Sequence, residues 1–307
     1  MGSAEDALPV VLDHPTDLLA SFRLHRFGGL DPTCQLDRQG LRQAVQTPHG
    51  PAVLDVRLDP ESGGRRFLVR AVGPGRAHLL ARAGRILGED DDPSRFVPSC
   101  APTRRLVRKV PGLRLTRAIS PFAMLVSIVL QQRVAWRDAA RAYRRLVLRH
   151  GQPGPGGLTL PPTPAQWARI PLAELSALEV ERKRADTLRR VARIAGHLDR
   201  MFDEDPAEVR RKLTSVRGLG PWTIETFLGF GLAHPDAVPL DDYDLPHRVA
   251  HLFLGKARSD DAEMLRILEP YRGQRWRVLR LLDASGADMP RFGPRVGSGR
   301  RRRSPPE

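Results

Sequence analysis

Three aspartates stand close together in the last third of the chain, as Asp241, Asp242 and Asp244, just before a segment with the apolar spacing of a helix. Carboxylates at the start of a helix are favoured by the free backbone amides and by the helix dipole. A carboxylate held there could stabilise a developing cation or activate a water molecule. The residue types alone do not separate the three aspartates, and all three could equally be helix caps.

Two glycines, Gly218 and Gly220, mark a sharp turn about twenty residues before these aspartates. Asp205 and Pro206 are typical of the start of a helix before this turn, and Pro221 is typical of the start of one after it. Glycine adopts left-handed backbone conformations without strain, so the turn can present unhindered amides. Amides at a helix start form an anion site, and a phosphate group is the expected ligand. A plain turn between two helices is the alternative.

The composition favours a polyanionic partner. The 307 residues carry a formal net charge of +15, for which a solvated basic surface is the alternative explanation, and the length suits two domains. Cys34 and Cys100 are the only cysteines, too few for a disulfide framework, a zinc knuckle or a four-cysteine iron–sulfur site. The histidines show no metal-ligand spacing, so we expect no metal cofactor.

Neither the first residues of the sequence nor its apolar runs predict a membrane segment. The first residues carry acids where a signal peptide needs positive charge, and the longest apolar run, 121–130, is too short to span a bilayer. We therefore expect a soluble cytoplasmic protein.

The pattern of apolar residues changes once along the chain. Alternation predicts strands between about residues 21 and 72, a helix follows over 77–87, the acidic run at 90–93 closes a first domain, and 99–111 is a basic connector. From Ser120 the spacing is helical, with a Gly- and Pro-rich loop over 151–164, further helices over 172–198, and a last helix over 274–284.

The run Val216-Arg217-Gly218-Leu219-Gly220-Pro221-Trp222-Thr223, followed by Asp241-Asp242-Tyr243, resembles the signature of the helix-hairpin-helix DNA glycosylases. The resemblance is closest to the alkylated-base (3-methyladenine, AlkA-like) branch. It implies an α+β chain: an N-terminal antiparallel sheet domain over 1–98, an all-helical glycosylase core over 99–287, and a basic tail over 288–307. The tail is expected to be disordered, either as a DNA arm or as a solubilising segment.

The resemblance also assigns roles to residues. It selects Asp242 as the acting carboxylate, with Arg248 closing the motif. Asp241 is left with a structural part, or adds negative field at the site. It implies a base pocket and a set of contacts to DNA. The pocket residues are Trp222, Tyr243, Tyr271 and Gln132; the DNA contacts are Arg133, Lys212, Arg217, Gly218, Leu219, Gly220, Thr223 and Arg248.

Two positions depart from the family pattern. Arg133 stands where the family has an apolar wedge residue, so it either enters the minor groove, reaches a phosphate or faces solvent. Trp222 stands where bifunctional members have a lysine, which predicts that no Schiff base forms. A monovalent cation held by hairpin carbonyls is also implied by the resemblance.

The sequence therefore predicts a monomeric, monofunctional glycosylase that excises alkylated purines, such as 3-methyladenine and 7-methylguanine, from damaged double-stranded DNA in base-excision repair. The base would be flipped out of the stack before its bond to the sugar is cut. Core packing is the alternative role of the aromatic residues. The alternative functions are a helix-hairpin-helix DNA-binding protein without catalysis and a glycosylase for deaminated or oxidised bases.

Overall fold

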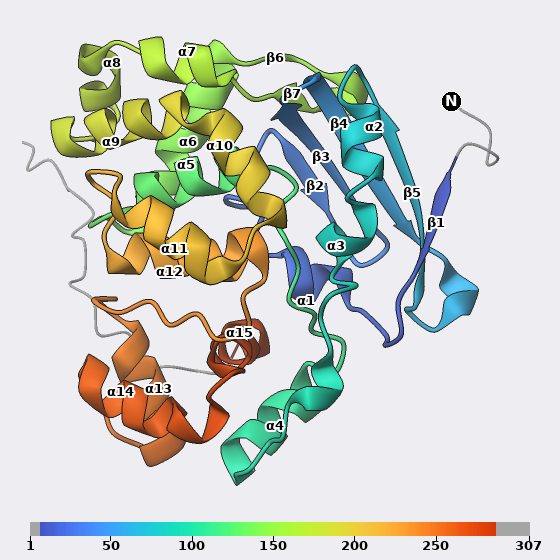
Figure 1. Cartoon of the computed structure of the whole chain (residues 1–307), viewed down its shortest axis with the longest axis vertical. Helices are drawn as coiled ribbons and strands as arrows, with labels where there is room; N and C mark the ends of the chain where they lie inside the picture. The colour runs from blue at the N-terminus through green and yellow to red at the C-terminus, as the bar shows by residue number, and fades with distance from the viewer. Residues whose placement is uncertain (1–6, 287–307) are drawn as a thin grey trace, which may run out of the picture.

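The computed structural model describes residues 7–286 and combines one antiparallel sheet with a helical bundle (Figure 1). The sheet has the strand order β1-β5-β4-β3-β2. Its strands are β1 (Leu8–Val11), β2 (Cys34–Leu36), β3 (Gly40–Thr47), β4 (Gly50–Leu58) and β5 (Arg66–Val72). The sheet followed by helices confirms the predicted α+β fold.

The predicted alternation in β4 is confirmed by burial. Leu54 and Val56 are fully buried, whereas the Arg57 side chain is exposed and pairs with Asp55 at 3.1 Å. Two details differ from the prediction. β1 begins before the predicted range, and residues 21–33 form no strand because α1 (Leu18–Phe22), capped by the Asp17 carboxylate, occupies the start of that segment.

Short helices cover the sheet and connect it to the bundle. The predicted helix over 77–87 is two helices, α2 (Arg76–Leu80) and α3 (Ala83–Leu87). The predicted basic connector is instead a helix, α4 (Ala101–Lys109), because Thr103 and Leu106 are buried at helical spacing while its basic residues face outward. The single-turn 3-10 helices are η2 (Pro60–Ser62), η3 (Pro93–Arg95), η4 (Pro155–Gly157), η5 (Met201–Asp203) and η6 (Glu269–Tyr271).

The bundle is built around α5 (Pro121–Gln131), which is apolar on all sides and buried against α6, α9 and α12. Ser120 caps it as predicted. The predicted loop over 151–164 contains a two-stranded ribbon of β6 (Gln152–Pro153) and β7 (Thr159–Leu160). The remaining helices are α6 (Trp136–His150), α7 (Pro164–Arg169), α8 (Leu172–Ala177), α9 (Arg182–Arg193), α10 (Ala195–Arg200), α11 (Pro206–Thr214), α12 (Pro221–Leu232), α13 (Leu245–Leu254), α14 (Asp261–Leu268) and α15 (Arg275–Ser285).

The sheet and the bundle share buried contacts. Asp91, from the acidic run predicted to close the first domain, accepts a hydrogen bond from Arg277 of α15 and another from the Leu115 amide at 3.0 Å. Phe202 of η5 belongs to the sheet's core although it follows that boundary by more than a hundred residues. The boundary at 98/99 stays a prediction, and the predicted tail at 288–307 lies outside the described residues. None of the helices in the described part of the chain is both long and apolar enough to span a membrane.

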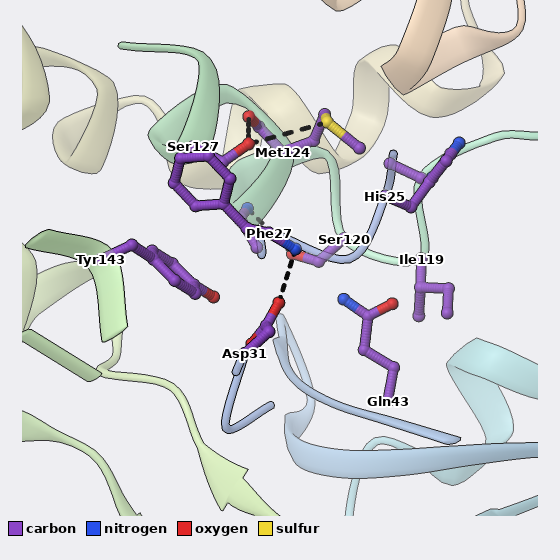
Figure 2. A pocket seen from close by; sticks show the side chains of 11 residues that line it. His25, Phe27, Asp31, Gln43, Ile119, Ser120, Met124, Ser127 and Tyr143 are labelled. Carbon is purple, nitrogen blue, oxygen red and sulfur yellow. Dashed lines mark hydrogen bonds between the residues drawn. The ribbon is translucent and has the colours of Figure 1, made fainter. Parts of the chain in front are cut away.

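A small cavity of about 20 Å³ lies between the sheet and α5 (Figure 2). Such a space holds little more than one water molecule, so it is too small for a purine. Asp31 and Tyr143 face it, and burial raises the pKa of both groups. His25 also lines it: Nε2 lies 3.1 Å from the Thr116 hydroxyl, and Nδ1 is shielded from solvent without a hydrogen-bond partner among the described residues.

His25 makes folding sensitive to acid. Burial first, and the nearby Arg280 second, lower the pKa of His25 from 6.5 to about 3. The unfolded chain therefore binds a proton at higher pH than the folded chain does. We expect the free energy of unfolding to fall as the pH drops from about 6.5 toward 3, by up to about 1.4 kcal/mol per pH unit from this group.

The test is urea unfolding of wild type and of His25→Gln between pH 4 and pH 7. The difference in unfolding free energy between the two proteins should shift in favour of the variant as the pH falls. His197→Gln, which changes an exposed histidine of α10, is the control and should run parallel to wild type. A pH-independent difference for His25→Gln would contradict the assignment.

Candidate active site

The glycine turn joins α11 to α12 and presents one exposed backbone edge. Asp205 caps α11 as predicted, accepting from the Ala207 amide at 2.8 Å. Gly218 has a φ of +100°, so it needs the left-handed conformation, whereas Gly220 is extended. At Gly220 neither the backbone conformation nor the space requires glycine, because a Cβ there would meet nothing within 4 Å. The absence of a side chain at Gly220 leaves the backbone surface open. Leu219 is 6% exposed and anchors the turn in the core.

Gln132 connects this turn to the end of α5. Its Nε2 donates to the Gly218 carbonyl at 3.0 Å and to the Thr223 hydroxyl at 2.9 Å. Thr223 is itself buried at the start of α12. The amide predicted to serve the base pocket thus fixes the hairpin in this structure, and it places the α5–α6 turn beside the hairpin.

Arg133 occupies that α5–α6 turn with an exposed side chain and a φ of +60°. A left-handed conformation costs a residue other than glycine about 1–2 kcal/mol. Such strain is retained where the surrounding structure fixes the backbone, often at functional turns. The predicted contact of Arg133 with DNA stays a prediction.

Asp242 is held by three N–H donors. Oδ1 accepts from the amides of Asp244 at 2.9 Å and Leu245 at 2.8 Å, which fixes the carboxylate over the start of α13. Oδ2 accepts from the Trp222 indole Nε1 at 2.7 Å. Short bonds from several donors hold a carboxylate in one orientation. The structure therefore brings the predicted acting residue and the first turn of α12 into direct contact.

The other two aspartates have different surroundings. Asp241 is exposed, has a φ of +63°, and donates its amide to Asp261 at 2.8 Å, which ties the loop to α14. Asp244 precedes α13, but its side chain makes no capping bond. Its burial raises the pKa of Asp244; the charge of Arg248 opposes this shift and that of Asp242 adds to it.

Arg248 and Lys212, both predicted to contact DNA, each form an ion pair within the protein. The Arg248 side chain bonds to Asp283 of α15 at 2.6 Å and is 23% exposed. Lys212 bonds to Glu204 at 2.8 Å. Each cation would have to break an ion pair to reach a phosphate, so both have a structural part in the free protein. Their contacts with DNA stay predictions. Arg217, in contrast, is exposed at the hairpin.

The predicted aromatic pocket is only partly assembled. Tyr243 is 64% exposed beside Asp242 in the chain, and Tyr271 is 5% exposed. Tyr271 packs between Phe96 and Phe253, and its hydroxyl accepts a hydrogen bond from Ser99 at 2.8 Å. Their contacts with a base stay predictions. Trp222 is the aromatic residue that reaches Asp242.

Thr187 and Arg190 of α9 support the hairpin, and no motif in the sequence pointed to them. A Cβ on Gly218 would lie 2.2 Å from the Thr187 hydroxyl, and Arg190 donates to the Arg217 carbonyl at 3.3 Å. The only sequence signal is a helix that is basic on the face opposite its apolar stripe. The Gly218 carbonyl accepts from Gln132 and the Arg217 carbonyl from Arg190. The cation implied by the resemblance stays a prediction. Within residues 7–286, no three His, Cys, Asp or Glu side chains are grouped to hold a metal.

Comparisons with known proteins agree with this geometry. The family model described as HhH-GPD superfamily base excision DNA repair protein matches residues 126–272, the stretch that contains Gln132, the hairpin and Asp242. A Mycobacterium tuberculosis protein named as a probable bifunctional transcriptional activator/DNA repair enzyme AlkA is 31% identical over 225 residues, 70% of this chain and 44% of that protein. The chain spans about half the length of the curated relatives it matches.

Solved structures share the whole fold. A 3-methyladenine DNA-glycosylase from Archaeoglobus fulgidus is 20% identical, with a TM-score of 0.73 over 91% of this chain and 98% of that one. An 8-oxoguanine glycosylase/lyase from Clostridium acetobutylicum is 14% identical, with a TM-score of 0.64 over 91% and 96%. These likenesses extend the match from the helical core to the sheet. The family match places residues 126–272 of the chain in the HhH-GPD superfamily of base excision DNA repair proteins.

Proposed function

We propose that the protein is a monofunctional DNA glycosylase that excises alkylated purines in base-excision repair, with Asp242 as its catalytic carboxylate. The observation that carries the proposal is the hydrogen bond from Trp222 Nε1 to Asp242 Oδ2 at 2.7 Å. It holds an electron-rich aromatic ring and a carboxylate together, directly after the hairpin that we propose binds phosphate. The names of the M. tuberculosis and A. fulgidus proteins support the same activity.

The reaction needs a carboxylate but no general acid to protonate the leaving base. Alkylation at N3 or N7 makes the purine ring cationic, so the base leaves as a neutral molecule with the electron pair of the N-glycosidic bond. The sugar is left as an oxocarbenium-like cation, which the Asp242 carboxylate stabilises. Water then adds to C1′ and gives up a proton, with the same carboxylate positioned as base. An abasic site remains.

The aromatic residues would recognise the base. A cationic purine is attracted to the face of an electron-rich ring, and tryptophan provides the strongest such face. Trp222 is fixed by its bond to Asp242, so the ring and the carboxylate would meet the same flipped nucleotide. Tyr243 and Tyr271 would add to this pocket on binding.

The same position explains why no strand break is expected. A glycosylase with lyase activity uses an amine to form a Schiff base with the sugar. Trp222, two residues after Gly220, has no amine to offer. The likeness to the 8-oxoguanine glycosylase/lyase is one of fold, so oxidised bases are tested as an alternative substrate. The partner is damaged duplex DNA, and a monomeric, cytoplasmic enzyme stays part of the proposal.

Replacing the carboxylate is the first test. Asp242→Asn keeps the size and loses the charge, so we expect release of methylpurines from methylated duplex DNA to fall by at least about 100-fold. DNA binding should persist. Wild type should leave sites that break only after alkali, and borohydride should trap no covalent complex.

Equal release by wild type and Asp242→Asn would refute the role of Asp242. Breaks before alkali, or a trapped complex, would refute the monofunctional assignment. Binding without release of methylated, deaminated or oxidised bases would instead favour a DNA-binding protein without catalysis.

Removing the indole donor tests the positioning of the carboxylate. Trp222→Phe keeps an aromatic ring but leaves Oδ2 of Asp242 without its bond. Because a hydrogen bond to a charged group contributes about 1.5–3 kcal/mol, we expect the single-turnover rate of excision to fall about 10- to 100-fold. Trp167→Phe in α7 controls for the loss of an indole. An unchanged rate in Trp222→Phe would show that the two amides hold Asp242 unaided.

We expect substitutions of Arg217 and Lys212, two cations near the hairpin, to have different effects on the salt dependence of DNA binding. Arg217 is exposed, so Arg217→Ala should flatten the slope of log affinity against log salt by about one unit. Lys212 is paired with Glu204, so Lys212→Ala should leave the slope unchanged. The measurement is the affinity of each variant for a duplex oligonucleotide from 50 to 300 mM salt. The opposite ranking would show that Lys212 leaves its ion pair on binding.

A further inference from the structure

The face of α9 beside the hairpin carries a row of basic side chains that the proposed chemistry does not use. They are Arg182, Lys183, Arg190 and Arg193, called here the α9 stripe. Figure 1 shows α9 next to the α11 and α12 pair that forms the hairpin. Arg182, Lys183 and Arg193 are exposed, and Arg190 is partly buried.

The hairpin is seated directly on this helix. Thr187 of α9 is 3% exposed, and a Cβ on Gly218 would lie 2.2 Å from its hydroxyl, so only glycine fits against it. Residues three and four apart share a helix face, which places Lys183 and Arg190 on either side of Thr187. Arg190 reaches the Arg217 carbonyl at 3.3 Å. Two cations of α9 therefore flank the glycine that presents the hairpin.

The stripe has no carboxylate partners in the described part of the chain. The two acids of the same helix region are taken by other arginines: Glu181 pairs with Arg184 at 3.7 Å and Asp186 with Arg189 at 3.5 Å. An uncompensated row of cations beside an anion site favours a longer polyanion over a single phosphate.

We propose that the α9 stripe is a second phosphate-binding element, which extends the grip of the hairpin along one strand of duplex DNA. From Arg182 to Arg193 the helix rises by roughly 16 Å, a length over which one strand carries about five phosphates. The proposal rests on the proposed function only in that its partner is DNA. It adds a footprint beyond the flipped nucleotide and makes affinity strongly dependent on salt.

The test uses an undamaged duplex oligonucleotide of 25 base pairs, so it requires no excision. The full-length variant Lys183→Ala/Arg190→Ala should reduce the magnitude of the slope of log affinity against log salt by about two units, and Arg182→Ala/Arg193→Ala by up to the same amount. Lys183→Arg/Arg190→Lys should keep the wild-type slope. Thermal unfolding of each variant shows whether it is folded.

A matched control separates a local contact from net charge. Arg65→Ala/Arg76→Ala removes two exposed arginines of the sheet domain and should leave the slope unchanged. If this control and Lys183→Ala/Arg190→Ala lower the slope equally, or if folded Lys183→Ala/Arg190→Ala keeps the wild-type slope, the proposal is wrong. If the slope depends on α9 but wild type releases no base, the footprint stands and the proposed excision fails.

Discussion

The hydrogen bond between Trp222 and Asp242 is the interaction on which the arrangement of the site depends. It joins the first turn of α12, which starts at the hairpin, to the loop that leads into α13. The bond therefore holds the glycine turn and the Asp242 carboxylate in one fixed arrangement. Under the proposed function, a DNA backbone held at the turn would place a flipped nucleotide beside Asp242.

The hairpin itself is held from two sides. Gln132 at the end of α5 bonds to the Gly218 carbonyl and to Thr223, and Thr187 of α9 fills the space where a Gly218 side chain would lie. These contacts fix the turn in the free protein, so the proposed binding of DNA would not have to order it. They also place Arg133 next to the hairpin. The α5–α6 turn and α9 thus both contact the hairpin.

The sheet serves this surface through its contacts with the bundle. Asp91 is buried between the two parts and bonds to Arg277 of α15, the helix that also holds Arg248 through Asp283. Breaking a buried ion pair by removing one partner costs about 3–5 kcal/mol. The sheet domain therefore stabilises the helix that supports the start of α13. This gives the N-terminal domain a structural part in the site.

Local signals in the sequence determined the helix starts at Asp205, Ser120 and Pro221 and the turn at Gly218. Each depends on neighbours only a few residues away along the chain. Asp242 was selected among the three aspartates by the family resemblance, and its catalytic role is a proposal. The helix at 101–109 and the pairing of Lys212 and Arg248 were decided by the tertiary structure, as were the exposed Tyr243 and the buried Tyr271. Burial and ion pairs arise between segments far apart in the chain, such as Arg248 and Asp283. No spacing of residues along one helix specifies which partner it will meet.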